Sequence, residues 1–236
     1  MKNKLVIFDF ADTIAKLSPS KEELLHKFIL NELSLDIPLK HIEEVYHYST
    51  NLLFYSSVNI KKIETKKEFY KKFNNDILSL LGIAHLIDSE KLFNYFNENG
   101  QHWILKDGVK ELFISLKEKG YLISLVSNFD ERLNQVLKNL EIYDLLDSKF
   151  ISQEIGLEKP NIEFFKLPLK KHNIDSKDTF FIGDSYFLDF IPSQSLGIFP
   201  ILLDENDRFP LIQKINKISN IIESKNIIFE RISKWN

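Results

Sequence analysis

The fold is decided by the stretch Lys4-Leu5-Val6-Ile7-Phe8-Asp9-Phe10-Ala11-Asp12-Thr13-Ile14. An apolar run with the character of a buried strand stops at a carboxylate, Asp9, and a polar turn follows directly. Ligands bind at the carboxyl ends of the strands in a parallel sheet, so a carboxylate there would point into a crevice. The alternative is that Asp9 only ends the strand or caps the segment that follows.

The composition is that of an ordinary globular protein, and it excludes several classes of function. The chain has 236 residues, 44% of them hydrophobic and 28% charged, so it can bury one large core or two small ones. A formal net charge of -3 provides no overall basic field, and we expect neither nucleic acid nor an acidic membrane surface as a partner. The absence of Cys removes disulfides, thiolate metal sites and a cysteine nucleophile.

No targeting or membrane segment is expected. Asp9 and Asp12 interrupt the N-terminal apolar run before the core of a signal peptide could form. No apolar stretch approaches the length of a membrane-spanning helix. Because the absence of Cys also fits a reducing compartment, we expect a cytoplasmic protein.

Apolar runs and helical spacings alternate along most of the chain. Buried strands are predicted at residues 5–10, 121–126, 179–182 and 199–203, and helices at 109–119, 132–140, 162–172 and from residue 211 onward. Strands that alternate with helices indicate a parallel sheet that is covered on both faces.

The interval from residue 17 to residue 101 has a different pattern. Its apolar residues follow helical spacing, and it contains no persuasive strand. Ser18-Pro19-Ser20 opens the interval as a helix start, and Asn99-Gly100 closes it. A helical insert directly after the loop of the first strand would lie over the carboxyl ends of the strands, like a lid.

Four short motifs carry a family resemblance. They are Asp9-Phe10-Ala11-Asp12-Thr13, Ser127-Asn128, Lys159-Pro160, and Gly183-Asp184-Ser185 with Asp189. In order, spacing and position at strand ends, they resemble the motifs of the haloacid dehalogenase superfamily of hydrolases. A single Ser-Asn or Lys-Pro pair is common by chance, but all four motifs in order are specific. The resemblance covers nearly the whole chain, and the insert matches only in place and helical character.

The resemblance implies an α/β fold with a Rossmann-like parallel-sheet core and a small helical cap domain inserted after the first strand. The core domain would comprise residues 1–16 and 102–236, and the cap domain residues 17–101. A small phosphorylated molecule would be the substrate, and the cap would select it.

The resemblance also assigns roles to individual side chains. Asp9 would be the catalytic nucleophile that forms a covalent aspartyl intermediate, since a carboxylate is already ionised at neutral pH. Ser127 and the Asn128 backbone would bind the transferred group, with Thr13 as a further substrate-binding residue. Lys159 would neutralise charge beside the nucleophile.

The resemblance implies a Mg²⁺ site in the same crevice. Asp9, the Ala11 carbonyl and Asp184 would bind the ion, with Asp189 behind them, because Mg²⁺ prefers hard oxygen ligands together with water and phosphate oxygens. Two interpretations of Asp189 remain open here: a direct metal ligand, or a residue that orients the ligands.

Ala11 departs from the pattern of the superfamily's phosphatases. These enzymes normally carry a second Asp at this position, which protonates the leaving oxygen and then activates the water that cleaves the intermediate. Asp12 is offset by one residue, and we expect it to shape the turn instead. General acid–base catalysis typically contributes ~10²–10⁴-fold to the rate, so its loss would restrict the enzyme to good leaving groups or require another proton source.

Three functions therefore remain open. The first is a Mg²⁺-dependent phosphatase with a modified site. The second is a hydrolase of C–P or C–X bonds, similar to phosphonoacetaldehyde hydrolases or dehalogenases; the former would require a cap lysine, for which Lys61, Lys62, Lys66 and Lys67 are positional candidates. The third is a non-catalytic descendant that binds a phosphorylated ligand or a protein. Retention of Asp9, Ser127, Lys159 and Asp184 favours an enzyme.

Overall fold

The computed structural model describes residues 4–56, 66–100 and 102–233. Contacts divide the chain into two compact units, which are described separately. The core unit comprises Met1–Lys16 and Trp103–Asn236, and the helical unit comprises Leu17–His102.

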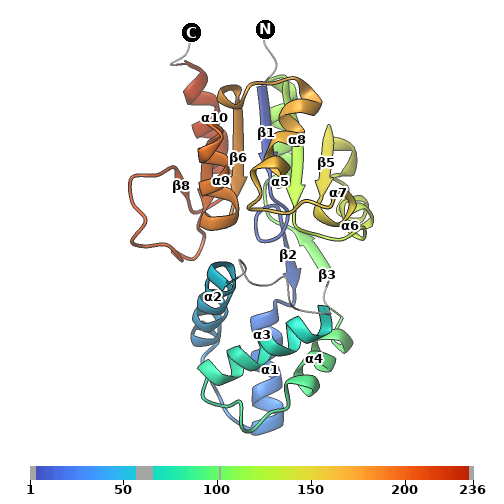
Figure 1. Cartoon of the computed structure of the whole chain (residues 1–236), viewed down its shortest axis with the longest axis vertical. Coiled ribbons are helices and arrows are strands. Elements are labelled where there is room, and N and C mark those ends of the chain that lie inside the picture. Colours follow the sequence, from blue (N-terminus) through green and yellow to red (C-terminus); the bar gives the residue numbers. More distant parts are fainter. Residues whose placement is uncertain (1–3, 57–65, 101, 234–236) are drawn as a thin grey trace. The chain divides into compact units, whose positions relative to one another are not determined.

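A six-stranded parallel sheet forms the centre of the core unit (Figure 1). Its strands are β1 (Lys4–Phe8), β4 (Tyr121–Ser127), β5 (Ser148–Ile151), β6 (Thr179–Gly183), β7 (Phe199–Leu203) and β8 (Lys217–Ile218). They lie in the order β5-β4-β1-β6-β7-β8, and every neighbouring pair is parallel. The predicted Rossmann-like parallel sheet is confirmed.

Helices connect these strands. They are α5 (Val109–Glu118), α6 (Leu133–Asn139), α7 (Ser152–Ile155), α8 (Ile162–His172), α9 (Ile191–Ser195) and α10 (Glu223–Ser233), with short 3-10 turns η2 (Tyr143–Leu145) and η3 (Ser176–Asp178) and a π-helical turn η4 (Tyr186–Phe190).

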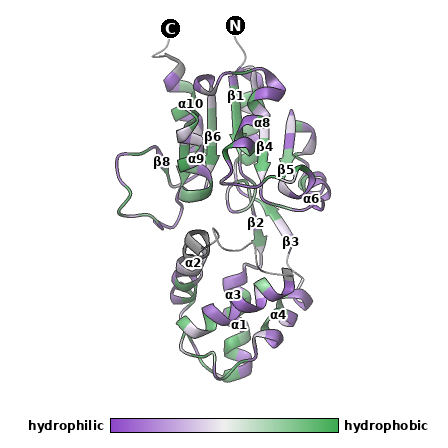
Figure 2. Cartoon of the chain, in the orientation of Figure 1, coloured by the Kyte–Doolittle hydropathy of each residue, from purple (hydrophilic) through white to green (hydrophobic). Residues whose placement is uncertain are grey.

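Both faces of the sheet are buried, which explains why its central strands are continuously apolar (Figure 2). In β1, Val6 and Phe8 join a core cluster that includes residues of α5, α6 and α10. The alternate residues Leu5 and Ile7 join another cluster with Phe164 of α8. Successive side chains of a strand point to opposite faces, so a strand that is covered on both sides has no polar face.

The strand order places a topological switch point beside β1. The chain passes from β1 to β4 on one side of β1 and later to β6 on the other. At such a switch point the loops at the carboxyl ends of the strands diverge, and ligands bind between them. Asp9 follows β1, Asn128 follows β4 and Asp184 follows β6. The topology alone therefore brings three of the four motifs to one edge of the sheet.

The helical unit contains α1 (Lys21–Leu33), α2 (Leu39–Ser56), α3 (Lys66–Leu80) and α4 (Ser89–Glu98). Leu25, Phe28, Ile42 and Ile77 belong to its own buried core. Ser20 caps α1 in a reciprocal capping box with Glu23, which satisfies backbone donors at the helix start. None of the helices in the described ranges is both long and apolar enough to cross a membrane.

Four strands were not expected from the sequence. β2 (Ala15–Ser18) and β3 (His102–Leu105) pair in a two-stranded sheet where the chain leaves and re-enters the core unit, and β5 and β8 extend the large sheet at its edges. The prediction of a helix from residue 211 onward is wrong as far as residue 222, because Leu211 is 92% exposed and α10 begins only at Glu223. The four unexpected strands are short and only partly buried, so they lack the continuous apolar run of β1.

Candidate active site

A buried lysine lies between two buried carboxylates at the carboxyl edge of the sheet. Lys159 Nζ is 2.6 Å from Asp9 Oδ1 and 2.7 Å from Asp189 Oδ1. Only 3% of the Lys159 side chain is exposed, and 9% and 2% of the Asp9 and Asp189 side chains. Charges in such surroundings persist only when they are paired, so these three groups form one electrostatic unit.

The side chain of Asn128 holds the backbone of Lys159 in place. Its amide Nδ2 donates to the Lys159 carbonyl (3.0 Å), and its Oδ1 accepts from the Lys159 backbone N–H (2.7 Å). Both polar ends of the Asn128 side chain are thus engaged by the residue that precedes the cis Pro160. A role in substrate binding would belong to the Asn128 backbone, as predicted, while the side chain fixes Lys159.

The local turn after β6 positions Asp189. Ser185 Oγ accepts from the Leu188 N–H (3.1 Å), and the Ser185 N–H donates to Asp189 Oδ2 (3.1 Å). This π-helical turn packs the carboxylate of Asp189 directly over Gly183, where an added Cβ would lie 2.4 Å from Asp189 Oδ2. A glycine is therefore required before Asp184. Lys159 and Ser185 together engage both oxygens of Asp189.

Asp184 completes an acidic cluster with Asp9 and Asp189. One carboxylate oxygen from each of the three residues can be chosen so that all lie within 4.8 Å of one another. The cluster could hold a metal ion, and its all-oxygen donor set suits a hard divalent cation. Thr13 is fully buried, and its hydroxyl lies 3.4 Å from Asp184 Oδ1.

Burial and ion pairing shift the titration of the cluster. Burial raises the pKa of Asp9, an effect that Lys159 opposes and Asp184 reinforces. Burial also raises the pKa of Asp189 to about 7, against the influence of Lys159. For Lys159, burial alone would lower the pKa, but Asp189 and Asp9 outweigh it and raise the pKa, so the lysine remains protonated.

The other predicted residues lie on the same loops. Ser127 ends β4 and is 1% exposed. Ala11 is half-buried and forms an isolated backbone bridge with Ala15. Asp12 adopts a left-handed backbone conformation with φ 56°, and its N–H donates to the Ala15 carbonyl (2.8 Å). Asp tolerates this conformation better than most residues, as expected for a residue that shapes the turn.

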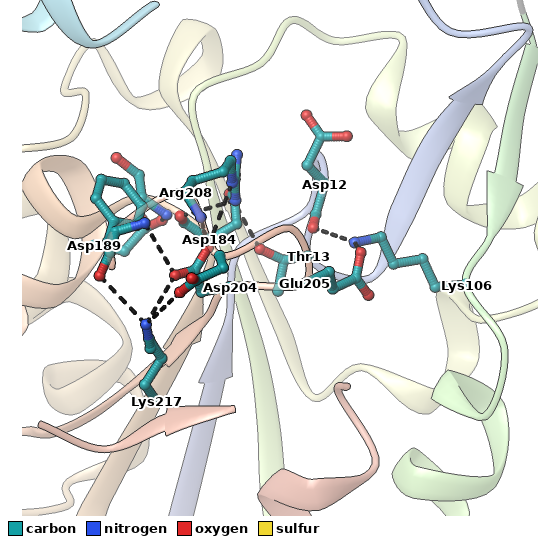
Figure 3. A network of polar contacts seen from close by, with 12 residues as sticks. Asp12, Thr13, Lys106, Asp184, Asp189, Asp204, Glu205, Arg208 and Lys217 are labelled. Atoms are coloured by element: carbon teal, nitrogen blue, oxygen red, sulfur yellow. Dashed lines mark hydrogen bonds and ion pairs between the residues drawn. The ribbon is translucent and has the colours of Figure 1, made fainter. Parts of the chain in front are cut away.

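The sequence interpretation missed a second layer of charged residues (Figure 3). Arg208 Nη2 donates to Asp184 Oδ2 (3.1 Å), and Asp204 accepts from the Arg208 backbone N–H (2.6 Å). Lys106 Nζ binds the Asp12 carbonyl and lies 2.7 Å from Glu205 Oε2. A signal for this layer exists, because Asp204 directly follows the apolar strand β7, just as Asp9 follows β1.

The fold and the site define a Rossmann-like α/β protein with a buried, lysine-paired acidic cluster at the switch point of its sheet. A family model described as haloacid dehalogenase-like hydrolase matches residues 3–192. The chain belongs to this family, and the predicted resemblance is confirmed.

Two relatives and one solved structure resemble the chain over most of its length. The chain is 21% identical to haloacid dehalogenase-like hydrolase domain-containing protein 3 of Mus musculus, over 86% of this chain and 82% of that protein. It is 22% identical to a glyceraldehyde 3-phosphate phosphatase of Pyrococcus abyssi, over 83% and 79%. A magnesium-bound crystal structure of YfnB from Bacillus subtilis aligns with a TM-score of 0.67 at 20% identity, covering 97% and 99% of the two chains.

Proposed function

We propose that this hydrolase is a Mg²⁺-dependent phosphatase that acts on a small phosphorylated metabolite through a covalent intermediate on Asp9. One observation carries the proposal: Asp9 directly follows β1 at the switch point, is paired with Lys159 at 2.6 Å and shares an acidic cluster with Asp184. The glyceraldehyde 3-phosphate phosphatases among its relatives support phosphate ester chemistry.

The reaction would proceed in two steps at Asp9. In the first, a carboxylate oxygen of Asp9 forms a bond to phosphorus while the bond from phosphorus to the leaving oxygen breaks. In the second, water attacks the acyl phosphate, which releases inorganic phosphate and regenerates the Asp9 carboxylate. Lys159 balances the charge of the nucleophile, and Ser127 and the backbone of Asn128 bind the phosphoryl oxygens.

The oxygen ligands that the residues of the acidic cluster offer fit Mg²⁺. Asp9, Asp184 and the Ala11 carbonyl would hold the ion, which when bound would offset the negative charge of the phosphoryl group. Asp189 is better suited to orienting, because Lys159 and Ser185 already engage its two oxygens. We therefore assign Asp189 to holding Lys159 in place rather than to binding the metal.

We assign residues 17–101 to a cap domain that selects the substrate. This segment forms its own buried core, so it can change its surface residues without disturbing the sheet of the core unit. Thr13 lies in the loop that leads into this segment and contacts Asp184, which supports a role beside the bound phosphate.

Ala11 limits which substrates the enzyme can use. Without a carboxylate at this position, the leaving oxygen departs unprotonated, and general acid catalysis of ~10²–10⁴-fold is lost. Aryl and acyl phosphates, whose leaving groups are stable as anions, should be cleaved much faster than alkyl phosphates.

A substrate screen with matched variants tests the proposal. Wild type and Asp9→Asn are assayed with aryl, acyl and alkyl phosphates, phosphonates and haloacids, each with and without Mg²⁺. We expect phosphate release by the wild type alone, only with Mg²⁺, and fastest from aryl or acyl phosphates. Turnover by Asp9→Asn at the wild-type rate would place the nucleophile elsewhere.

The same screen separates the alternatives. Cleavage of a phosphonate or a haloacid would replace the phosphatase by a C–P or C–X hydrolase, and no turnover of any compound would indicate a ligand-binding descendant. Of the lysines that phosphonate chemistry could use, Lys61 and Lys62 lie outside the described residues, as does the side chain of Lys66. Lys67, whose side chain is described, is paired with Glu90 at 2.9 Å.

A further inference from the structure

Arg208 places a second cation against the acidic cluster, and its partner, Asp184, is not one of the two carboxylates that Lys159 contacts. Its Nη2 donates to Asp184 Oδ2 (3.1 Å) and to the Asp184 carbonyl (3.2 Å), as Figure 3 illustrates. The side chains are 25% and 15% exposed, so solvent screens the pair only in part. Lys159 contacts Asp9 and Asp189, whereas the guanidinium contacts Asp184.

The loop that carries this arginine is firmly anchored. The Asp204 side chain is fully buried, and it accepts from the backbone N–H groups of Arg208 (2.6 Å) and Phe209 (3.1 Å). Arg208 Nε lies 3.9 Å from Asp204 Oδ1, and Lys217 Nζ lies 3.3 Å from Asp204 Oδ2. Asp204 contacts both the backbone and the guanidinium of Arg208, and it thereby positions this side chain to contact Asp184.

This contact conflicts with metal binding. Mg²⁺ requires near-ideal octahedral geometry and short bonds to oxygen, and it competes with any other cation for the charge of the same carboxylate. A guanidinium at Asp184 Oδ2 uses a lone pair of this carboxylate and offsets its charge. The carboxylate keeps further lone pairs, so Asp184 can still bind the ion, but it binds the ion less strongly while Arg208 offsets its charge.

We propose that Arg208 is a positioning residue that competes with Mg²⁺ for Asp184 and so lowers the affinity of the free enzyme for the ion. The inference rests on the proposed function, which places Mg²⁺ at Asp184. The arginine holds the Asp184 carboxylate in place and balances its charge. A bound ion would draw on the charge of the same carboxylate, while the guanidinium would keep its neighbours at the Asp184 carbonyl and at Asp204.

The competition predicts that removing the positive charge tightens metal binding. We expect Arg208→Gln to bind Mg²⁺ about tenfold more tightly than the wild type, which corresponds to about 1.4 kcal/mol. Arg208→Lys keeps the charge but lacks the planar two-sided fork, and its affinity should lie between the two. Arg231→Gln is the matched control, because it removes the same charge from a residue that stacks on Phe199, at the opposite end of β7.

Calorimetric titration of Mg²⁺ into EDTA-treated, substrate-free protein measures these affinities, and thermal melts in EDTA verify that each variant unfolds cooperatively. If Arg208→Gln does not fold, the Mg²⁺ affinity of Arg208→Lys relative to the wild type tests the competition instead. Equal or weaker binding by the Arg208 variants, with wild-type binding intact, would overturn the competition and leave the proposed phosphatase standing. Absence of Mg²⁺ binding in every protein would instead refute the magnesium requirement of the proposed function and, with it, this inference.

Discussion

Lys159→Met should destabilise the protein strongly, because it removes the cation that two buried carboxylates share. Lys159 Nζ is 2.6 Å from Asp9 and 2.7 Å from Asp189, and at least nine-tenths of each side chain is buried. Removing one partner of a buried ion pair typically costs ~3–5 kcal/mol, since the remaining charge has neither water nor a counter-ion. Here two carboxylates lose the same partner, so we expect about 4–5 kcal/mol.

Urea unfolding in EDTA measures this cost, because EDTA removes any metal that would replace the lost charge. Lys166→Met is the control: Lys166 pairs with Glu163 at 2.5 Å, but these side chains are 35% and 50% exposed, and such a pair contributes about 0–1 kcal/mol. Asp189→Asn in the Lys159→Met background removes one unpaired charge and should recover part of the loss. A loss of unfolding free energy below about 1 kcal/mol, or no recovery of it in the double variant, would refute the claim that Lys159 stabilises the two buried carboxylates.

Three further outcomes are expected. Ala11→Asp should raise activity on alkyl phosphates by up to ~10²-fold by restoring a general acid; an unchanged ratio of alkyl to aryl turnover would show that another group supplies the proton. Asn128→Ala should lower the rate while leaving the sheet intact, because Lys159 loses both backbone contacts with the amide; circular dichroism and phosphate release measure the two effects, and an unchanged rate would contradict this role. Burial lowers the pKa of His172, whose Nε2 lies 2.8 Å from Ser148 Oγ, so the unfolded state takes up the proton first as pH falls below about 6.5 and stability is lost. Urea midpoints at about pH 7.5 and pH 5.5 should therefore differ less in His172→Gln than in the wild type, and an equal difference would exclude this histidine as a source of the pH dependence.

The sequence predicted those parts of the molecule that depend on local pattern. Continuous apolar runs identified β1, β4, β6 and β7, since strands that are buried on both faces carry no polar side. The edge strands β5 and β8 were missed because an edge strand needs no such run, and only the neighbour to which it pairs defines it.

The same distinction applies to the site. Asp9 and Asp184 were predicted from motifs that directly follow apolar strands, and Lys159 from a motif that precedes a helix, so the chain itself provides the signal. Arg208 was not, because its position depends on the anchoring of its loop by Asp204, a contact within residues 204–210, for which the sequence predicted no element. The role of Asn128 in fixing Lys159 likewise depends on two loops that lie 31 residues apart in the chain.

Trapping of the covalent intermediate tests the central claim most directly. Ala11 leaves the hydrolysis of the acyl phosphate without a general base, so the intermediate should accumulate during turnover of a good aryl or acyl phosphate with Mg²⁺. Borohydride reduction after an acid quench converts a phosphorylated aspartate to homoserine, which peptide mass spectrometry locates. We expect homoserine at position 9 in the wild type and none without substrate. Modification of Asp184 or Asp189 instead, or turnover with no modified aspartate, would contradict a covalent intermediate on Asp9.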